Sequence, residues 1–181
     1  MKFLPTGLDG AWLIEPERLE DALSSFTRTF CAREFAAHGL HTGWVQHNVS
    51  VNSQAGTLRG LHYQAAPHGE IKLVHCTRGR MFDVIADLRR DSPTFRQTFC
   101  TELGLTDARM LYIPLGFAHG FLTLEDDTEV TYCISAFYEP ASVRGVRWND
   151  PALAIPWPRA IRVMADRDAN FPDIGDEGIT Y

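Results

Sequence analysis

Short runs of β-branched and aromatic residues, spaced at near-regular intervals, fill the chain between residues 44 and 137. Apolar and polar residues alternate within these runs, which is typical of strands that bury one face. The residues between the runs are mostly Gly, Pro, Asp and Ser, which favour turns. The runs cover residues 44–51, 58–64, 71–77, 80–88, 95–103, 110–115, 119–124 and 129–137. This pattern predicts an all-β protein, a sandwich or barrel of antiparallel strands, with a jelly roll among the options.

The N-terminal part of the chain has a different pattern. Residues 15–26 have a helix-like composition, and Pro16 suits the first turn of a helix. Residues 30–40 predict a second, short helix that ends at Gly39. Both segments precede the strand-rich region, so we expect them at the periphery of the fold.

The alternation ends after Pro140, and residues 148–158 contain three prolines and two tryptophans. We expect residues from about 141 to 181 to wrap around the barrel rather than to form a second domain. A chain of 181 residues suits one domain with a sizeable core. The sequence therefore predicts a single domain over residues 1–181.

The composition argues against several classes of protein. The chain is 45% hydrophobic and 22% charged, as in an ordinary globular protein. Its formal net charge is -6 and it has no basic run, which argues against binding to nucleic acid. The start of the chain has no apolar signal region, and no stretch reaches 18 apolar residues, so we expect neither secretion nor a membrane span. The cysteines are widely spaced and predict reduced, mostly buried thiols in a cytoplasmic protein; they are Cys31, Cys76, Cys100 and Cys133.

Four ionisable residues interrupt the strand-like sequence of residues 58–88: Arg59, His62, Lys72 and Asp83. A charged side chain that faces the core of a sandwich needs a partner or a chemical task. Lys72 has extra weight because the chain contains fifteen Arg and only two Lys, and an ammonium is compact and titratable. Each residue alone is more often structural. Together, within about thirty residues, they indicate an active site.

Three further residues join this group. His119 follows a Pro–Gly turn at the predicted start of a strand. Tyr132 shares its strand face with the apolar residues two positions before and after it, and so it should point inward. A buried tyrosine hydroxyl needs a hydrogen-bond partner and is a competent general acid. Asp168 is a candidate partner that would orient a histidine and stabilise its imidazolium form.

The chain resembles a known family in four blocks: GTLRGLHYQ, KLVHCTRGRMFDVIADLRRDSPTF, LYIPLGFAHGF and GVRWNDPALAIPWP. These blocks are long and specific, and they resemble the dTDP-4-dehydrorhamnose 3,5-epimerases from about Gln46 to Asp168. The resemblance implies a cupin-type antiparallel jelly-roll barrel and a homodimer to which the N-terminal segment, about residues 1–45, contributes. It also implies that neither a metal nor another cofactor is needed. The implied reaction is inversion of C3 and/or C5 of a nucleotide-linked 4-keto-6-deoxyhexose.

The resemblance also implies roles for individual residues. His62 is similar to the family's base, Asp168 to the partner of that base, and Tyr132 to the acid on the opposite face of the sugar. Lys72 resembles the residue beside the C4 oxygen. The implied substrate-binding residues are Arg59 and His119 at the diphosphate, Tyr138 stacked in the nucleotide site, Gln46 and Asn48 lining that site, and Phe26 and Arg28 in a segment that reaches the partner's nucleotide.

The sequence departs from the family pattern where the nucleotide is concerned. The family usually has Asp-x-Arg-Gly-x-Phe-x-Glu near residue 21, whereas this chain has DALSSFTR at residues 21–28. The resemblance implies a strand or loop here, which competes with the helix that the composition predicts. Leu23 and Arg28 replace the arginine and glutamate expected at the nucleotide. Because a guanidinium only donates, we expect a CDP- or GDP-linked substrate to be preferred over a dTDP-linked one if Arg28 faces the base.

Three other departures are more scattered: His47 replaces an acidic residue, Cys133 replaces a lysine, and ADRD at residues 165–168 replaces Ser-x-Lys-Asp. The residues implied in the chemistry itself match the family.

Two readings from other classes compete with an epimerase. A metal-dependent cupin is suggested by PLGFAH at residues 114–119, but the first cupin metal motif is incomplete because only His62 is present in HYQ. Metal analysis of the purified protein distinguishes a metal-dependent cupin from a metal-free epimerase. A non-catalytic sugar-binding cupin would need His62 and Tyr132 for stability but not for turnover. A mono-epimerase acting at C3 or C5 alone shares the same base and acid, and the sequence does not separate it from a double epimerase.

Overall fold

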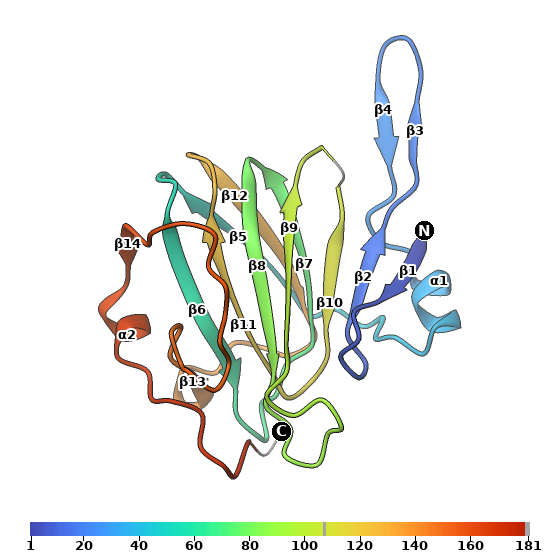
Figure 1. The fold of residues 1–181 in the computed structure, drawn as a ribbon. Helices are drawn as coiled ribbons and strands as arrows, with labels where there is room; N and C mark the ends of the chain where they lie inside the picture. Colours follow the sequence, from blue (N-terminus) through green and yellow to red (C-terminus); the bar gives the residue numbers. More distant parts are fainter. Residues whose placement is uncertain (107, 180–181) are drawn as a thin grey trace.

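The fold is known from a computed structural model, which describes residues 1–106 and 108–179. Two antiparallel sheets face each other as a sandwich of the jelly-roll type (Figure 1). The all-β expectation is therefore confirmed. The first sheet has the strand order β1 (Lys2–Pro5), β2 (Trp12–Glu15), β10 (Met110–Ile113), β7 (Lys72–Arg78), β12 (Thr128–Ile134) and β5 (Gln46–Asn52).

The second sheet supplies the opposite wall of the sandwich. Its strand order is β13 (Val143–Gly145), β6 (Thr57–Gln64), β11 (Phe117–Thr123), β8 (Arg80–Asp87) and β9 (Thr98–Gly104). A short strand, β14 (Val163–Met164), pairs with β6 in parallel. The runs predicted from the sequence correspond to β5 through β12. The run predicted at residues 95–103 begins earlier than the strand in the structure. Residues 91–97 form a loop, and β9 starts at Thr98.

The main core lies between the two sheets. Alternate residues of each strand point inward, and the inward side chains of β8 and β7 include Met81, Ile85, Val74 and Cys76, all fully buried. Full burial of one such apolar side chain contributes roughly 1.5–3 kcal/mol. The same alternation directs Asp83 of β8 inward, where it is fully buried between Met81 and Ile85. The core is thus apolar except where the strands carry the ionisable residues noted in the sequence.

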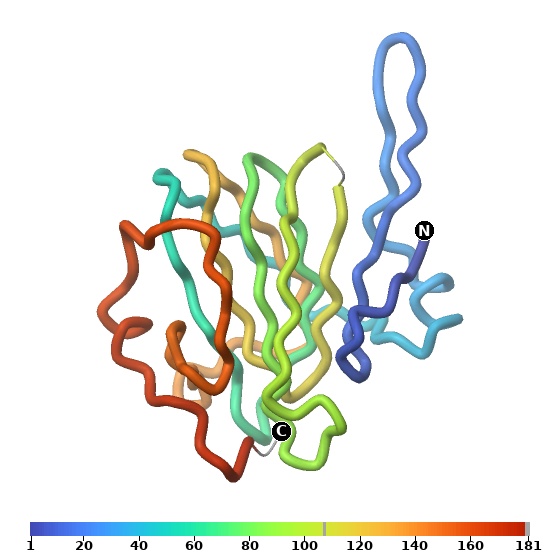
Figure 2. The backbone as a smooth tube through the Cα atoms, viewed as in Figure 1, coloured from blue at the N-terminus to red at the C-terminus, as the bar shows by residue number. Residues whose placement is uncertain are grey.

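The C-terminal segment covers the outer face of the second sheet, as the sequence predicted. Leu153 of this segment is buried, and Trp157 packs edge to face against Phe82 of β8 with ring centroids 6.0 Å apart. Figure 2 shows this orange-to-red segment running beside β6 and returning toward the foot of the sandwich. It carries the short helix α2 (Asp166–Ala169).

The N-terminal segment covers the outer face of the first sheet. The predicted helix at 30–40 is present as α1 (Ala32–Ala37), and the chain leaves it through Gly39 with a positive φ of 69°. Phe35 of α1 is fully buried and packs against the aromatic rings of Phe3 and Phe30. Both α1 and α2 are short and peripheral, as expected.

The helix expected at residues 15–26 is wrong. This segment forms a hairpin of β3 (Arg18–Glu20) and β4 (Ser25–Thr27), which projects away from the sandwich (Figure 1). The reason is local: the Asp21 carboxylate accepts hydrogen bonds from the backbone N–H groups of Leu23 and Ser24, at 2.8 and 2.7 Å, and closes a tight turn. The strand or loop implied by the family resemblance is therefore confirmed for this segment.

No disulfide joins the four cysteines, all of which lie in the described part of the chain; Cys76 is buried and the other three are half-buried. Among the described residues, no helix is long and apolar enough to cross a membrane.

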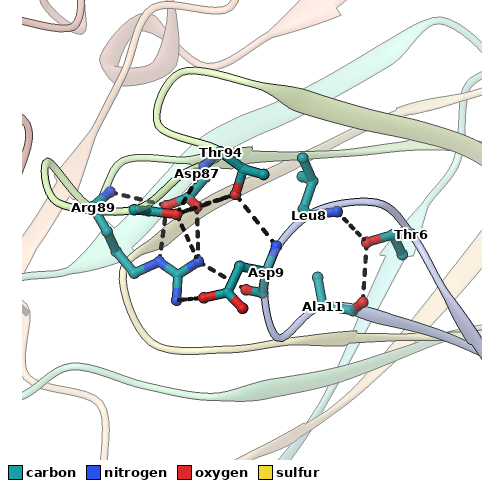
Figure 3. A network of polar contacts seen from close by, with 8 residues as sticks. Thr6, Leu8, Asp9, Ala11, Asp87, Arg89 and Thr94 are labelled. Carbon is teal, nitrogen blue, oxygen red and sulfur yellow. Dashed lines mark hydrogen bonds and ion pairs between the residues drawn. The ribbon is translucent and has the colours of Figure 1, made fainter.

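A buried carboxylate ties the N-terminal turn to the loop between β8 and β9. Both oxygens of Asp87 accept hydrogen bonds, from the backbone N–H and guanidinium of Arg89 and from the hydroxyls of Ser92 and Thr94. Arg89 also donates to the backbone carbonyl of Asp9 at 2.8 Å (Figure 3). Burial raises the pKa of Asp87, but the hydrogen bonds outweigh this effect and hold its pKa below the ordinary value.

We expect Asp87→Asn to lower the free energy of unfolding by about 2–4 kcal/mol, because it removes the carboxylate that lies 2.7 Å from a mostly buried guanidinium, whose contact with the exposed Asp9 carboxylate is longer, at 3.5 Å. A lowered folded-state pKa means that the ionised carboxylate stabilises the fold above its unfolded pKa of about 3.9, and that this stabilisation is lost as the pH falls through the folded value. The difference from the wild type should therefore be constant between about pH 5 and 8 and shrink in acid. Urea unfolding at several pH values measures this difference in the free energy of unfolding. Asp91→Asn, an exposed substitution in the same loop, is the control; an equal loss there would contradict the assignment.

Candidate active site

A cavity of about 380 Å³ opens at one end of the sandwich, between the two sheets. Its walls come from β5, β7 and β12 of the first sheet and from β6 and β11 of the second. Most of the residues predicted from the sequence line it: Gln46, Asn48, Arg59, His62, Lys72, His119, Tyr132 and Tyr138. The structure therefore brings together side chains from strands that are far apart along the chain.

A bulge in β6 directs two of these residues to the same side. His62 pairs with His119 of β11, whereas Arg59 pairs with Phe121, so three steps along β6 match two steps along β11. In a regular strand, Arg59 and His62 would face opposite sides of the sheet. The bulge is tight at Gly60, where φ is +116° and an added Cβ would lie 2.6 Å from the Cα of Gly120. Only glycine fits this position.

His62 is held by a buried carboxylate from the C-terminal segment. Its Nε2 lies 2.7 Å from Oδ1 of Asp168, a residue that is 1% exposed. Oδ2 of Asp168 accepts the backbone N–H of Gly60 at 3.0 Å. Both carboxylate oxygens are thus engaged, and the bulge and His62 share one anchor.

The charge state of this pair follows from its contacts. Burial raises the pKa of Asp168, but hydrogen bonds from His62 and Gly60 outweigh it and keep the pKa below the ordinary value. A carboxylate only accepts, so Nε2 of His62 carries the proton and the lone pair is on Nδ1. Burial lowers the pKa of His62, the Asp168 carboxylate partly offsets this, and the positive charges of Lys72 and Arg167 lower it further. The neutral imidazole required of a general base is therefore favoured.

Tyr132 points inward from β12, as its alternation with Val130 and Ile134 predicted. Its ring meets the ring of His119 edge to face, with centroids 6.1 Å apart. Burial, and then the negative charge of Asp83, raises the pKa of the Tyr132 hydroxyl above its ordinary value. The hydroxyl therefore keeps its proton and can act as a donor.

Lys72 lies at the cavity wall as half of a buried ion pair. Its Nζ is 2.9 Å from Oε1 of Glu70, and the two side chains are 10% and 11% exposed. Nζ also approaches the backbone carbonyl of His62 at 3.5 Å. Sequence reasoning missed Glu70, although its position two residues before Lys72 was a usable signal, since such residues share one side of an extended chain.

A second histidine–carboxylate pair lies deeper in the sandwich. Nε2 of His119 is 2.6 Å from Oδ1 of Asp83, and both residues are buried. Arg59 is positioned by Asn52 of β5, whose side-chain oxygen accepts from its Nε at 3.3 Å. Asn52 was not identified from the sequence, because its partner lies across the sandwich.

Polar contacts at the mouth fix the loop after β12. Oε1 of Gln46 accepts the backbone N–H of Tyr138 at 3.1 Å, and the amide of Gln64 donates to the carbonyl of Phe137 at 3.3 Å. Tyr138 itself is 57% exposed. An exposed aromatic ring at a cavity mouth is available for stacking.

Phe26 and Arg28 lie outside this cavity. They are in the hairpin, beside a separate hollow of about 160 Å³, and Nη1 of Arg28 is 3.4 Å from Oε1 of Glu34. Within one chain, they do not meet the other predicted site residues. Their expected place at a partner's nucleotide involves a second copy of the chain.

The departures from the family pattern fall in different places. Cys133 and His47 contact each other at 3.7 Å, and Cys133 packs with the cluster that lies outside the first sheet. Arg167, in contrast, lines the cavity. Among residues 1–106 and 108–179, no group of three or more His, Cys, Asp or Glu side chains is placed to hold a metal ion.

Comparisons with known proteins agree with this geometry. The family profile for dTDP-4-dehydrorhamnose 3,5-epimerase matches residues 5–176. A dTDP-4-dehydrorhamnose 3,5-epimerase from Sinorhizobium fredii is 38% identical over 93% of this chain and 87% of its own. The crystal structure of the Bacillus anthracis 3,5-epimerase, with TDP and pyrophosphate bound, superposes with a TM-score of 0.92 at 40% identity, over 95% of this chain and 98% of that one.

A third similar structure is that of ChmJ, a 3'-monoepimerase from Streptomyces bikiniensis in complex with dTDP. It was solved as a double mutant with one histidine changed to asparagine and one tyrosine to phenylalanine. It has a TM-score of 0.90 and 33% identity, over 98% of this chain and 92% of its own. With the profile covering nearly the whole sequence, this chain belongs to the dTDP-4-dehydrorhamnose 3,5-epimerase family.

Proposed function

We propose that this protein inverts C3 and/or C5 of a dTDP-linked 4-keto-6-deoxyhexose by removing a proton beside the ketone and returning one to the opposite face. The observation that carries the proposal is the cavity in which the buried His62–Asp168 pair, Tyr132 and Lys72 meet. The names of the relatives support the dTDP-linked substrate.

In the first step, His62 removes the proton. Hydrogens on C3 and C5 are acidic because they flank the C4 ketone, and loss of either one gives an enolate with its charge on O4. The lone pair on Nδ1 accepts the proton, and Asp168 stabilises the imidazolium that forms. Lys72, beside O4, stabilises the negative charge as it develops. The Glu70 contact at 2.9 Å supports a fixed position for this ammonium.

In the second step, Tyr132 donates its proton to the carbon from the other face, which inverts the centre. The raised pKa of its hydroxyl supports a protonated phenol at neutral pH. The ChmJ double mutant also supports the two roles, because its substituted histidine and tyrosine have the same separation along the chain as His62 and Tyr132. The phenolate left behind is reprotonated from solvent or by the imidazolium before the next turnover.

The rest of the cavity is suited to the nucleotide diphosphate. Arg59 supplies donors for the diphosphate, His119 is the second residue that the family resemblance assigns to it, and Tyr138 offers a ring for stacking. Gln46 and Asn48 present polar side chains to the same space. These roles account for the polar inner face of β5, a strand that would otherwise turn apolar residues inward.

A homodimer is supported by apolar surface that one chain leaves exposed. Val49 and Val51 on the outer face of β5 are 61% and 60% exposed. The projecting hairpin exposes Leu19, Leu23 and Phe26. Contiguous exposed apolar side chains mark an interface more often than a free surface. We infer that the hairpin packs on a second copy and brings Phe26 toward its nucleotide; a single-chain mass in light scattering would contradict this.

The alternatives give distinct outcomes in one experiment, which is incubation with the 4-keto sugar nucleotide in D₂O. A double epimerase incorporates deuterium at C3 and C5, and a mono-epimerase at only one of them. A non-catalytic binding protein incorporates none. A metal-dependent enzyme would lose activity with chelator and regain it with a divalent cation.

His62→Asn should remove deuterium incorporation, with a loss of about 10²–10⁴-fold in rate, because the base is gone while Asp168 keeps a hydrogen-bonding neighbour. Mass spectrometry of the recovered sugar measures the incorporation. His47→Asn, on the opposite side of the first sheet, is the matched control and should retain wild-type exchange. Normal exchange by a folded His62→Asn protein would rule out His62 as the base.

Tyr132→Phe should separate the two halves of the reaction. Without the phenol, His62 still removes and returns a proton on one face, so deuterium enters the substrate while inverted product forms at least about 10²-fold more slowly. NMR of the sugar distinguishes wash-in from inversion. Tyr112→Phe, which removes a hydroxyl bonded to the His41 backbone outside the cavity, should lower stability only. Full inversion by Tyr132→Phe would place the acid elsewhere.

The nucleotide preference is decided by calorimetric titration with dTDP, CDP and GDP. Because Arg28 is paired with Glu34, we expect dTDP to bind most tightly, held by stacking and diphosphate contacts. A preference of about 5- to 150-fold for CDP or GDP would instead show that Arg28 leaves Glu34 and donates to the base. Arg28→Ala is the informative variant, since it should leave dTDP affinity unchanged in the first case and weaken CDP or GDP in the second.

A further inference from the structure

Arg167 is the charged side chain nearest to the ring of His62 apart from Asp168. Its Nη2 lies 3.3 Å from Nε2 of His62, and its Nε lies 3.4 Å from Oδ1 of Asp168. That oxygen is the one that accepts the His62 proton. The guanidinium also lies over the Phe171 ring, with Cζ 6.0 Å from its centroid. The guanidinium therefore contacts the imidazole–carboxylate pair, although more than half of the side chain is exposed to solvent.

The contact with His62 is not itself a hydrogen bond of the favourable kind. Nε2 of His62 carries a proton that is directed to Asp168, so it has no lone pair for a guanidinium N–H. The favourable contact of Arg167 is with the carboxylate. The histidine and the arginine thus share one oxygen, which has two lone pairs, and the guanidinium partly offsets the negative charge that would stabilise an imidazolium.

Charged or titratable groups lie beside His62 on three elements, and on β11 the group is His119, which pairs with His62 in the strand register and is bound to Asp83. Asp168 and Arg167 approach from α2, and Lys72 approaches from β7 with Glu70 as its counter-charge. Phe171 adds an uncharged ring at 5.5 Å. Lys72 and, to a smaller extent, Arg167 both disfavour the imidazolium form of His62, and of the two Arg167 also contacts the Asp168 carboxylate.

We propose that Arg167 is a positioning residue that shares the Asp168 carboxylate with His62 and thereby sets the pH range over which the imidazole works as a base. This inference rests on the proposed function of His62. An imidazolium next to a fixed guanidinium is disfavoured, so His62 stays neutral at lower pH than the Asp168 carboxylate alone would allow. His62 is then a weaker base, but a larger fraction of the protein has it in the neutral form in mild acid.

The sign of the effect is fixed. Removing the arginine charge raises the pKa of His62, so a larger fraction is protonated at a given pH below neutrality. The acid limb of kcat/KM for deuterium exchange should therefore move to higher pH. Since Arg167 is more than half exposed, solvent screens its charge, and we expect a shift of at least about half a pH unit, or about a threefold loss of rate on that limb.

Three variants test this. Arg167→Gln removes the charge and should shift the acid limb of the kcat/KM profile by the full amount. Arg167→Lys keeps the charge without the forked geometry and should shift that limb less. Arg144→Gln is the matched control, because Arg144 is exposed on β13, donates to the backbone carbonyls of Ala141 and Val143, and is not among the residues that line the cavity. Its limb should stay at the wild-type position.

A second readout does not depend on turnover. The His62 ring can be titrated by NMR in substrate-free protein labelled at histidine, with His62→Asn used to assign the signal. A rise in the His62 pKa of about half a unit or more in Arg167→Gln is expected. An unchanged pKa would overturn the proposal, even if activity fell. A raised KM with an unmoved acid limb would assign Arg167 to substrate binding instead, and an equal shift in Arg144→Gln would reduce the effect to general surface charge.

These outcomes are separate from failure of the proposed function. If the wild type exchanges no deuterium at any pH, the assignment as an epimerase fails. The NMR titration still decides whether Arg167 controls the protonation of His62.

Discussion

The buried carboxylate of Asp168 is the interaction on which the site depends. One oxygen holds the ring of His62, and the other holds the backbone of Gly60, where β6 bulges. If the carboxylate were absent, the C-terminal segment would lose one of its polar anchors to the sheet, and a buried N–H and a half-buried imidazole would both lose a partner. The bulge, His62 and the C-terminal wrap are therefore one structural unit, although Asp168 is more than a hundred residues from His62 in the chain.

The sandwich accommodates the other charges in the same manner. Lys72 is paired with Glu70, His119 with Asp83, and Arg59 is positioned by Asn52. Each pair joins residues that would be costly to bury singly. The cavity is thus a polar region that continues directly into an apolar core, and its charged side chains are held by neighbouring side chains. This arrangement suits a reaction in which charge develops on a ketone oxygen, since fixed groups need no reorganisation as the charge appears.

Alternation in the sequence predicted the strands and the direction of Tyr132 because both depend on local periodicity. The same rule places Arg59 and His62 on opposite faces, and only the bulge, which depends on β11, brings them together. Asn52 was missed because its partner, Arg59, comes from the opposite sheet. Glu70 was missed although its partner, Lys72, is only two residues away. The helix predicted at residues 15–26 failed because composition cannot register a turn closed by the single side chain of Asp21. Asp168 could be linked to His62 only through the family resemblance, since no local pattern relates them.

The positions where this chain departs from its family are not equivalent once they are placed in space. His47 and Cys133 contact each other outside the first sheet, so their joint change preserves a local contact and leaves the cavity untouched. Leu23 is almost fully exposed on the hairpin and so contributes little to packing within its own chain. Arg167 alone stands in contact with the base and its carboxylate. A guanidinium can reach both through its fork, whereas an ammonium at the same position is a single point of charge. Of these changes, the one at Arg167 is therefore positioned to act on the chemistry itself, and the others act on packing or on the surface offered to a second chain.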